Sequence, residues 1–167
     1  MITVGEKSPW NDRDDERVES AEKIGQHRQF ILELAERVHA WYGELVLLNV
    51  EEIDQGSLLT IEPKRLGSAS VWVVAAEWID LQIGDTNCRF TFCYTDDNIT
   101  LVQEILRGVA AGEATEIRGP GRSLITVKID GNTVQTYPGT ESLFLALLPV
   151  PGWRSWGTRT VFPAYSL

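Results

Sequence analysis

The stretch Asp96–Arg118, which reads DDNITLVQEILRGVAAGEATEIR, indicates the fold class more clearly than any other part of the chain. Its apolar residues recur at three- and four-residue intervals, which predicts a helix with one buried face. These residues are Leu101, Val102, Ile105, Leu106 and Val109. Asp96, Asp97 and Asn98 suit a helix N-terminus, and Gly112 suits a C-terminal stop. Because strand-like segments lie on both sides, the helix is expected to cover a β-sheet.

The residues before this helix predict one long helix followed by five strands. Residues 1–19 read as an irregular lead-in, with an earlier helix start near Asp12 left open, and a helix is predicted from Ser20 to Tyr42. The strands are predicted at Glu44–Val50, Leu58–Glu62, Ser70–Trp78, Ile79–Ile83 and Cys88–Tyr94. The continuous apolar character of the third segment favours a central strand, and the last two segments suit a hairpin.

Shorter strands are predicted after the Asp96–Ala111 helix. They are Ala114–Arg118, Ser123–Ile129 and Thr133–Tyr137, and Ser142–Leu148 suits either a helical turn or a last strand. Asp130-Gly131 is a strong two-residue hairpin signal. This order is not a strict β-α-β alternation, so it predicts an α+β fold. We expect a single domain over residues 1–167, with a mainly antiparallel sheet of about six to eight strands packed by two helices.

The charge of the chain is negative and uneven. The net charge is −9, and residues 1–62 carry 14 acidic and 6 basic side chains, against 10 and 9 in residues 63–167. An acidic surface repels phosphate, so neither nucleic acid nor an anionic membrane is expected as a partner. No basic start with an apolar block opens the chain, and no apolar run is long enough to span a bilayer. We therefore expect a cytoplasmic protein.

The sequence offers no catalytic motif and predicts no metal and no cofactor. Cys88 and Cys93 are an odd number of residues apart, so on a strand they would face opposite sides, with Cys88 in the core. His27 and His39 lie about three helical turns apart, too far to share one metal or one proton relay. There is no G-x-S-x-G elbow and no phosphate-binding glycine loop. The prediction is a protein that is not an enzyme.

Two groups of residues are candidates for contact with a protein partner. The acidic group comprises Glu19, Glu22, Glu33 and Glu36 of the first helix and Glu51, Glu52 and Asp54 of the turn predicted after it. Such carboxylates could complement a basic protein, although a solvated helix face is the plainer interpretation. The second group is Trp153, Arg154 and Trp156, a mixture enriched at binding hot spots. Burial of both indoles for packing is the alternative for that group.

In size, acidity and lack of motifs the chain resembles the immunity proteins of bacterial polymorphic and contact-dependent toxin systems. The segments that carry this resemblance are Asp12–Glu22, Glu51–Asp54 and Gly152–Gly157. The resemblance implies a high-affinity protein partner, often a nuclease, whose basic substrate site is blocked by occlusion.

Three hypotheses follow. The first is a protein-binding module that presents its acidic groups to a basic partner such as a toxin domain. The second is a small enzyme or ligand-binding domain, with a pocket between sheet and helices that is lined by His27 or His39, carboxylates and Arg89. The third is an oligomer formed by pairing of an exposed sheet edge.

Overall fold

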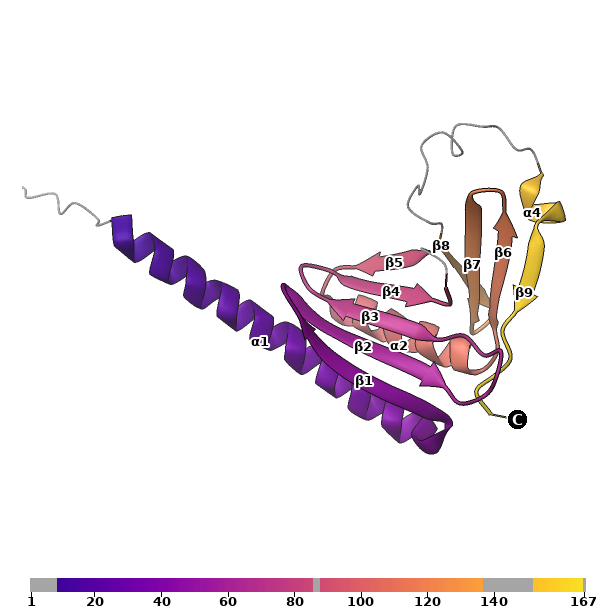
Figure 1. The fold of residues 1–167 in the computed structure, drawn as a ribbon, viewed down its shortest axis with the longest axis horizontal. Helices are drawn as coiled ribbons and strands as arrows, with labels where there is room; N and C mark the ends of the chain where they lie inside the picture. Colours follow the sequence, from indigo (N-terminus) through magenta and orange to yellow (C-terminus); the bar gives the residue numbers. More distant parts are fainter. Residues whose placement is uncertain (1–8, 86–87, 137–151, 167) are drawn as a thin grey trace, which may run out of the picture.

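The computed structural model describes residues 9–85, 88–136 and 152–166, with side chains from residue 25 onward. These described residues form two antiparallel sheets, three α-helices and a 3-10 turn (Figure 1). The first half comprises α1 (Pro9–Tyr42), η1 (Gly43–Leu45), β1 (Val46–Ile53), β2 (Gly56–Pro63), β3 (Val71–Ala75), β4 (Ile79–Ile83) and β5 (Arg89–Phe92). The second half comprises α2 (Asp96–Ala110), β6 (Ala114–Gly119), β7 (Arg122–Ile129), β8 (Asn132–Thr136), α4 (Trp153–Trp156) and β9 (Thr158–Val161). The predicted segment Ser142–Leu148 lies outside the described residues.

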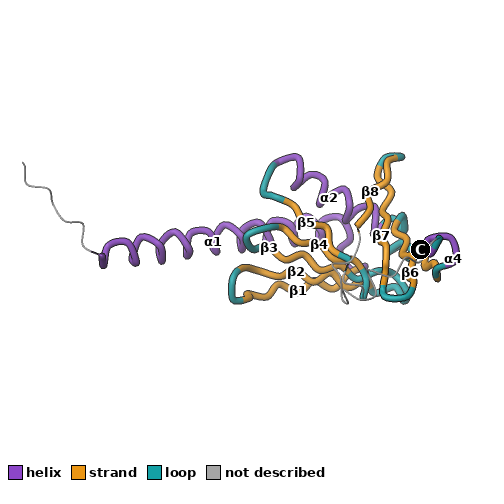
Figure 2. Tube along the Cα trace, turned by 90° about the horizontal axis from the view of Figure 1, so that it is seen from above, coloured by secondary structure: helices purple, strands orange, loops and turns teal. Residues whose placement is uncertain are grey.

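Helix α1 begins earlier than predicted. It starts at Pro9, so the expectation of an irregular lead-in over residues 1–19 is wrong for residues 9–19. Proline is well suited to a first helical turn, because its missing N–H would have no intrahelical partner there. Ile31, Leu34 and Val38 are buried, and they anchor the C-terminal half of α1 on the sheet. The N-terminal half extends beyond the end of the sheet (Figures 1 and 2).

The first sheet has five strands in the order β1-β2-β3-β4-β5, each paired with the next in the chain. The predicted central position of the Ser70–Trp78 segment is confirmed, because β3 lies in the middle of this order. The predicted hairpin of the next two segments is also confirmed, with Ile79 opposite Phe92 and Gln82 opposite Arg89. Helices α1 and α2 both lie on the same side of this sheet (Figure 2).

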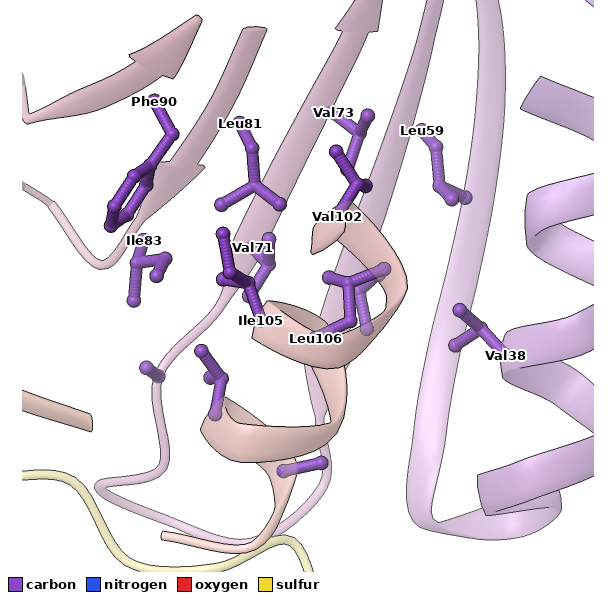
Figure 3. Close-up of a cluster of buried hydrophobic side chains, with 14 of the residues drawn as sticks. Val38, Leu59, Val71, Val73, Leu81, Ile83, Phe90, Val102, Ile105 and Leu106 are labelled. Atoms are coloured by element: carbon purple, nitrogen blue, oxygen red, sulfur yellow. The ribbon is translucent and has the colours of Figure 1, made fainter. Parts of the chain in front are cut away.

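Helix α2 closes the core of the five-stranded sheet. Val102, Ile105 and Leu106 are buried and point toward the inward side chains of the strands (Figure 3). Those inward side chains include Leu59, Val71, Val73, Leu81 and Phe90. The helix cap is Thr95, whose Oγ1 accepts a hydrogen bond from the Asn98 backbone N–H at 3.3 Å. The predicted glycine stop is confirmed, since Gly112 has a φ of +81°.

The predicted α+β fold with antiparallel strands is confirmed, but the described residues form nine strands in two sheets, not a single sheet of about six to eight strands. The second sheet has the order β8-β7-β6-β9. It packs on α2, where Gly108 allows a close approach: a Cβ atom there would lie 2.8 Å from Val127 Cγ1. The Asp130-Gly131 hairpin is confirmed, with φ values of 45° and 80° as a tight turn between β7 and β8 requires. All four residues of strand β9 are exposed, so this strand has no buried face.

The C-terminal tail joins the two sheets and α2. The Tyr165 hydroxyl donates to the Ala69 carbonyl at 2.8 Å, and the Tyr165 N–H donates to the Ala110 carbonyl at 2.8 Å. Arg65 Nη1 donates to the Ala164 carbonyl at 3.0 Å. Buried apolar residues from both sheets and both long helices belong to one cluster, so the tail closes a continuous core.

Candidate functional site

Two acidic side chains of α1, Glu33 and Glu36, point away from the sheet. Glu33 and Glu36 are exposed, and they lie on the opposite side of the helix from the buried Ile31, Leu34 and Val38. Gln29 Nε2 donates a hydrogen bond to Glu33 Oε1 at 2.9 Å, one turn away. Glu19 and Glu22 belong to α1, but their side chains lie outside the described part of the structure.

The acidic residues predicted for a turn after Val50 are divided between strand and turn. Glu51 and Glu52 are the sixth and seventh residues of β1, and only Asp54 lies in the turn before β2. Alternation along the strand puts Glu52 on the side of α1, where Arg28 Nη1 lies 3.1 Å from its Oε1. Glu51 points to the other side of the sheet, away from Glu33 and Glu36. The candidate carboxylates whose side chains are described therefore do not form one contiguous surface.

The aromatic residues near the C-terminus have unequal exposure. Trp153 is only 9% exposed, and its ring covers Gly119, where an added Cβ atom would lie 3.0 Å from Cε3. Packing therefore accounts for Trp153, so the alternative of burial holds for one of the two indoles. Trp156 is 54% exposed and Arg154 is exposed. These two residues remain accessible on the surface formed by α4.

A surface that the sequence did not indicate lies on the five-stranded sheet, on the side opposite the two helices. Strand pairing brings outward residues from five strands into two rows. One row is Glu51, Leu58, Val74, Asp80 and Thr91, and the next is Asn49, Thr60, Trp72, Gln82 and Arg89. We call the surface formed by these rows the open face. No described helix or strand covers it (Figures 1 and 2).

The open face mixes apolar groups with carboxylates. Trp72 and Val74 of the central strand are half-buried by their neighbours, and Leu47 and Ile53 at its margin are 56% and 40% exposed. Asp80 Oδ1 accepts a hydrogen bond from Thr91 Oγ1 at 2.6 Å. Recognition of this surface required the strand register, because residues far apart in sequence form each row. Among the described residues that were predicted to contact a protein partner, only Glu51 belongs to it.

The two histidines lie apart on α1 and have different surroundings. The His27 ring stacks on Tyr94 with centroids 5.3 Å apart, and Tyr94 in turn donates a hydrogen bond to the Ala76 carbonyl at 3.0 Å. Burial raises the pKa of Tyr94 to about 12, and the nearby Asp80 carboxylate adds to this effect. His39 is exposed twelve residues further along α1. Among the described residues, no group of three His, Cys, Asp or Glu side chains is arranged to hold a metal ion.

The two cysteines lie as predicted. Cys88 is buried and Cys93 is exposed, and no disulfide joins these two cysteines.

A shallow groove of about 590 Å³ lies between α2 and the β7–β8 turn. Its charged lining residues are Glu104, Arg107, Glu113, Lys128 and Asp130. The Arg107 guanidinium lies 4.3 Å from the centre of a Trp41 ring, so part of its charge faces an aromatic surface. The groove is not lined by the residues expected in the second hypothesis, His27, His39 and Arg89. Arg89 is on the open face, whereas His27 and His39 are on α1 at the opposite side of the sheet.

No protein-family model, no curated protein and no solved structure significantly matches this chain. Among the described helices, none is both long enough and apolar enough to cross a lipid bilayer.

Proposed function

We propose that this chain is a non-catalytic protein-binding module that works in the cytoplasm and occludes the active surface of a basic protein, in the manner of an immunity protein. The observation that carries the proposal is the open face, where apolar side chains and carboxylates lie together without a covering element among the described residues. Exposed apolar surface bordered by charge is typical of sites that bind other proteins.

The charge of the chain supports a basic partner. The net charge is −9, and opposite charge on a partner would accelerate encounter and disfavour the wrong partners. Several carboxylates are already neutralised within the chain, such as Glu52 by Arg28 and Glu44 by Lys64 at 3.1 Å. Exposed pairs of this kind are weak, so a partner's cations can compete for them.

Purification of the tagged chain from its source cell tests the proposal. We expect a one-to-one complex with one basic protein, detected by native mass spectrometry, and a slower association of that complex as salt is raised. Recovery of the chain alone, or of a partner whose association rate is independent of salt, would argue against it.

A ligand-binding function is the second candidate, and the groove beside α2 is the observation that favours it. Lys128 is exposed in this groove with Glu113 and Asp130 nearby, an arrangement suited to a small zwitterionic ligand. A thermal-shift screen of amino acids and related zwitterions tests this function. The increase in melting temperature caused by a bound zwitterion should be lost in Lys128→Ala. It should be retained in Lys64→Ala, which removes an exposed lysine elsewhere. The space between the sheet and the helices, in contrast, is filled by buried apolar side chains (Figure 3).

A further inference from the structure

The geometry of the open face suits a flat protein surface. Neighbouring strands lie about 4.8 Å apart, so five strands give a width of about 19 Å, and the five residues of the central strands β3 and β4 give a length of about 17 Å. Trp72 occupies the middle strand, with Thr60 on one side and Gln82 on the other. An indole at the centre of a patch, surrounded by polar groups, is the usual arrangement of an interface anchor.

The charge of the open face is negative. Its ionisable side chains are Glu51, Asp80 and Arg89, and Glu62 of β2 joins them at the margin beside Leu47. This side of the sheet therefore carries three carboxylates and one guanidinium group. Glu51 and Glu62 are exposed, whereas Asp80 is half-buried beside Val74.

We infer that the partner docks on the open face, and that this partner is a protein surface with lysine or arginine side chains around an apolar centre. The inference rests on the proposed function and names the surface that performs it. The apolar centre would cover Trp72 and Val74, while the cations would pair with Glu51, Glu62 and Asp80. Coverage would remove water from these pairs and strengthen each of them.

A second copy of the chain fits this face poorly. Two open faces brought together would oppose three carboxylates with three carboxylates, and like charges at close range disfavour association. A cationic partner removes this repulsion and replaces it with attraction.

The size of the face indicates that its margin takes part as well. A stable complex buries about 800 Å² per partner. The strand dimensions above give the sheet face a flat footprint of roughly 320 Å². The exposed apolar residues around it, Leu47, Ile53 and the 46% exposed Trp78 in the turn before β4, would supply further contact.

A defined peptide probe tests the inference. The probe is a cyclic β-hairpin with lysine and leucine on one face, and two matched hairpins carry glutamate for lysine or serine for leucine. Binding is followed by NMR of the labelled full chain, using the Trp72 indole N–H and the amides of β1–β5. We expect saturable binding of the lysine–leucine hairpin alone, with the largest shifts at Trp72.

Two carboxamide variants localise the binding. Glu51→Gln/Glu62→Gln/Asp80→Asn should weaken the hairpin affinity about tenfold at low salt, because three weak charge pairs are removed together. Glu33→Gln/Glu36→Gln removes two carboxylates from the outer side of α1 and should leave the affinity unchanged. Both variants keep side-chain size, and their unperturbed spectra would verify the fold. Trp72→Thr, which retains a strand-forming residue, should weaken binding at any salt concentration.

The inference is overturned if the shifts map to α1, if the triple variant binds like the unmodified chain, or if the glutamate hairpin binds equally well. These results leave the proposed function standing when a basic partner still co-purifies with the chain. If no such partner co-purifies but the hairpin binds at Trp72, the proposed function is refuted. The inference that the open face binds a cationic surface is then still supported.

Discussion

The hydroxyl of Tyr165 should contribute measurably to stability, because the C-terminal tail joins the two sheets through it. The residue is 4% exposed, and its hydroxyl donates to the carbonyl of Ala69, which is 2% exposed, at 2.8 Å. Tyr165→Phe keeps the ring and its edge contact with Tyr42, whose centroid lies 5.7 Å away. It leaves the buried Ala69 carbonyl without this donor, so we expect a loss of about 1–2 kcal/mol.

Tyr94→Phe is the matched control, because it removes the same kind of hydrogen bond at an accessible site. Tyr94 is 37% exposed and donates to the Ala76 carbonyl at 3.0 Å, where water can replace the lost donor. We expect a cost below about 0.5 kcal/mol there. Urea unfolding monitored by tryptophan fluorescence measures both, and the Tyr165 variant should also lower Tm by about 2–8 °C. An equal or larger cost for Tyr94→Phe would refute the reasoning.

Three further outcomes follow from individual residues. Ser57→Ala should raise stability by about 1 kcal/mol, measured from the urea midpoint, since the Ser57 hydroxyl is fully buried and has no hydrogen-bond partner among the described residues. Gly112→Ala should lower the same midpoint by about 2 kcal/mol or more, because its φ is +81° and the new Cβ atom would lie 2.8 Å from the Ala164 nitrogen. Alkaline pH should also destabilise the fold, because burial raises the pKa of Tyr94 to about 12 and that of Tyr165 further. An unfolded tyrosine titrates near pH 10, so their contribution is complete below about pH 10 and is lost as pH rises toward 12. A urea midpoint that stays constant from about pH 9 to about pH 11.5 would contradict this.

The local signals in the sequence predicted most of the elements. The apolar spacing of Asp96–Ala111 located α2 to within one residue, and Asp130-Gly131 located the β7–β8 turn. Both signals depend on residues that are neighbours in the chain. The predicted helix start at Ser20 was wrong because the mixed-charge run before it has no apolar periodicity, whereas the alternative start near Asp12 came within three residues of Pro9.

The division into two sheets could not be predicted from local patterns. It depends on the pairing of β6 with β9, whose paired residues are 40 to 46 positions apart in the chain, and on the close contact of Gly108 with β7. In the sequence, the β6–β9 pairing is represented only by the four exposed residues Thr158–Val161, and the contact with β7 only by one glycine within a helix. Neither has a periodicity that distinguishes it from a loop or an ordinary helical residue.

The candidate site could be predicted only in part, because it too depends on residues that are far apart in the chain. Charge alone selected Glu33, Glu36 and Glu51, but alternation along β1 and the position of α1 separate them onto opposite sides of the sheet. Trp72 was included in an apolar strand, and its outward direction became evident only from its pairing with Thr60 and Gln82. Composition therefore predicted that a partner would be basic, whereas the strand register was needed to recognise the open face.

The association rate of the co-purified basic partner with three forms of the chain tests the central claim most directly. Stopped-flow measurements at low salt compare the unmodified chain, Glu51→Gln/Glu62→Gln/Asp80→Asn and Glu33→Gln/Glu36→Gln. We predict a reduction of about tenfold for the triple variant and none for the helix variant, because electrostatic steering acts through the charges nearest the contact. Equal rates for the unmodified chain and the triple variant, or a reduction confined to the helix variant, would contradict the account.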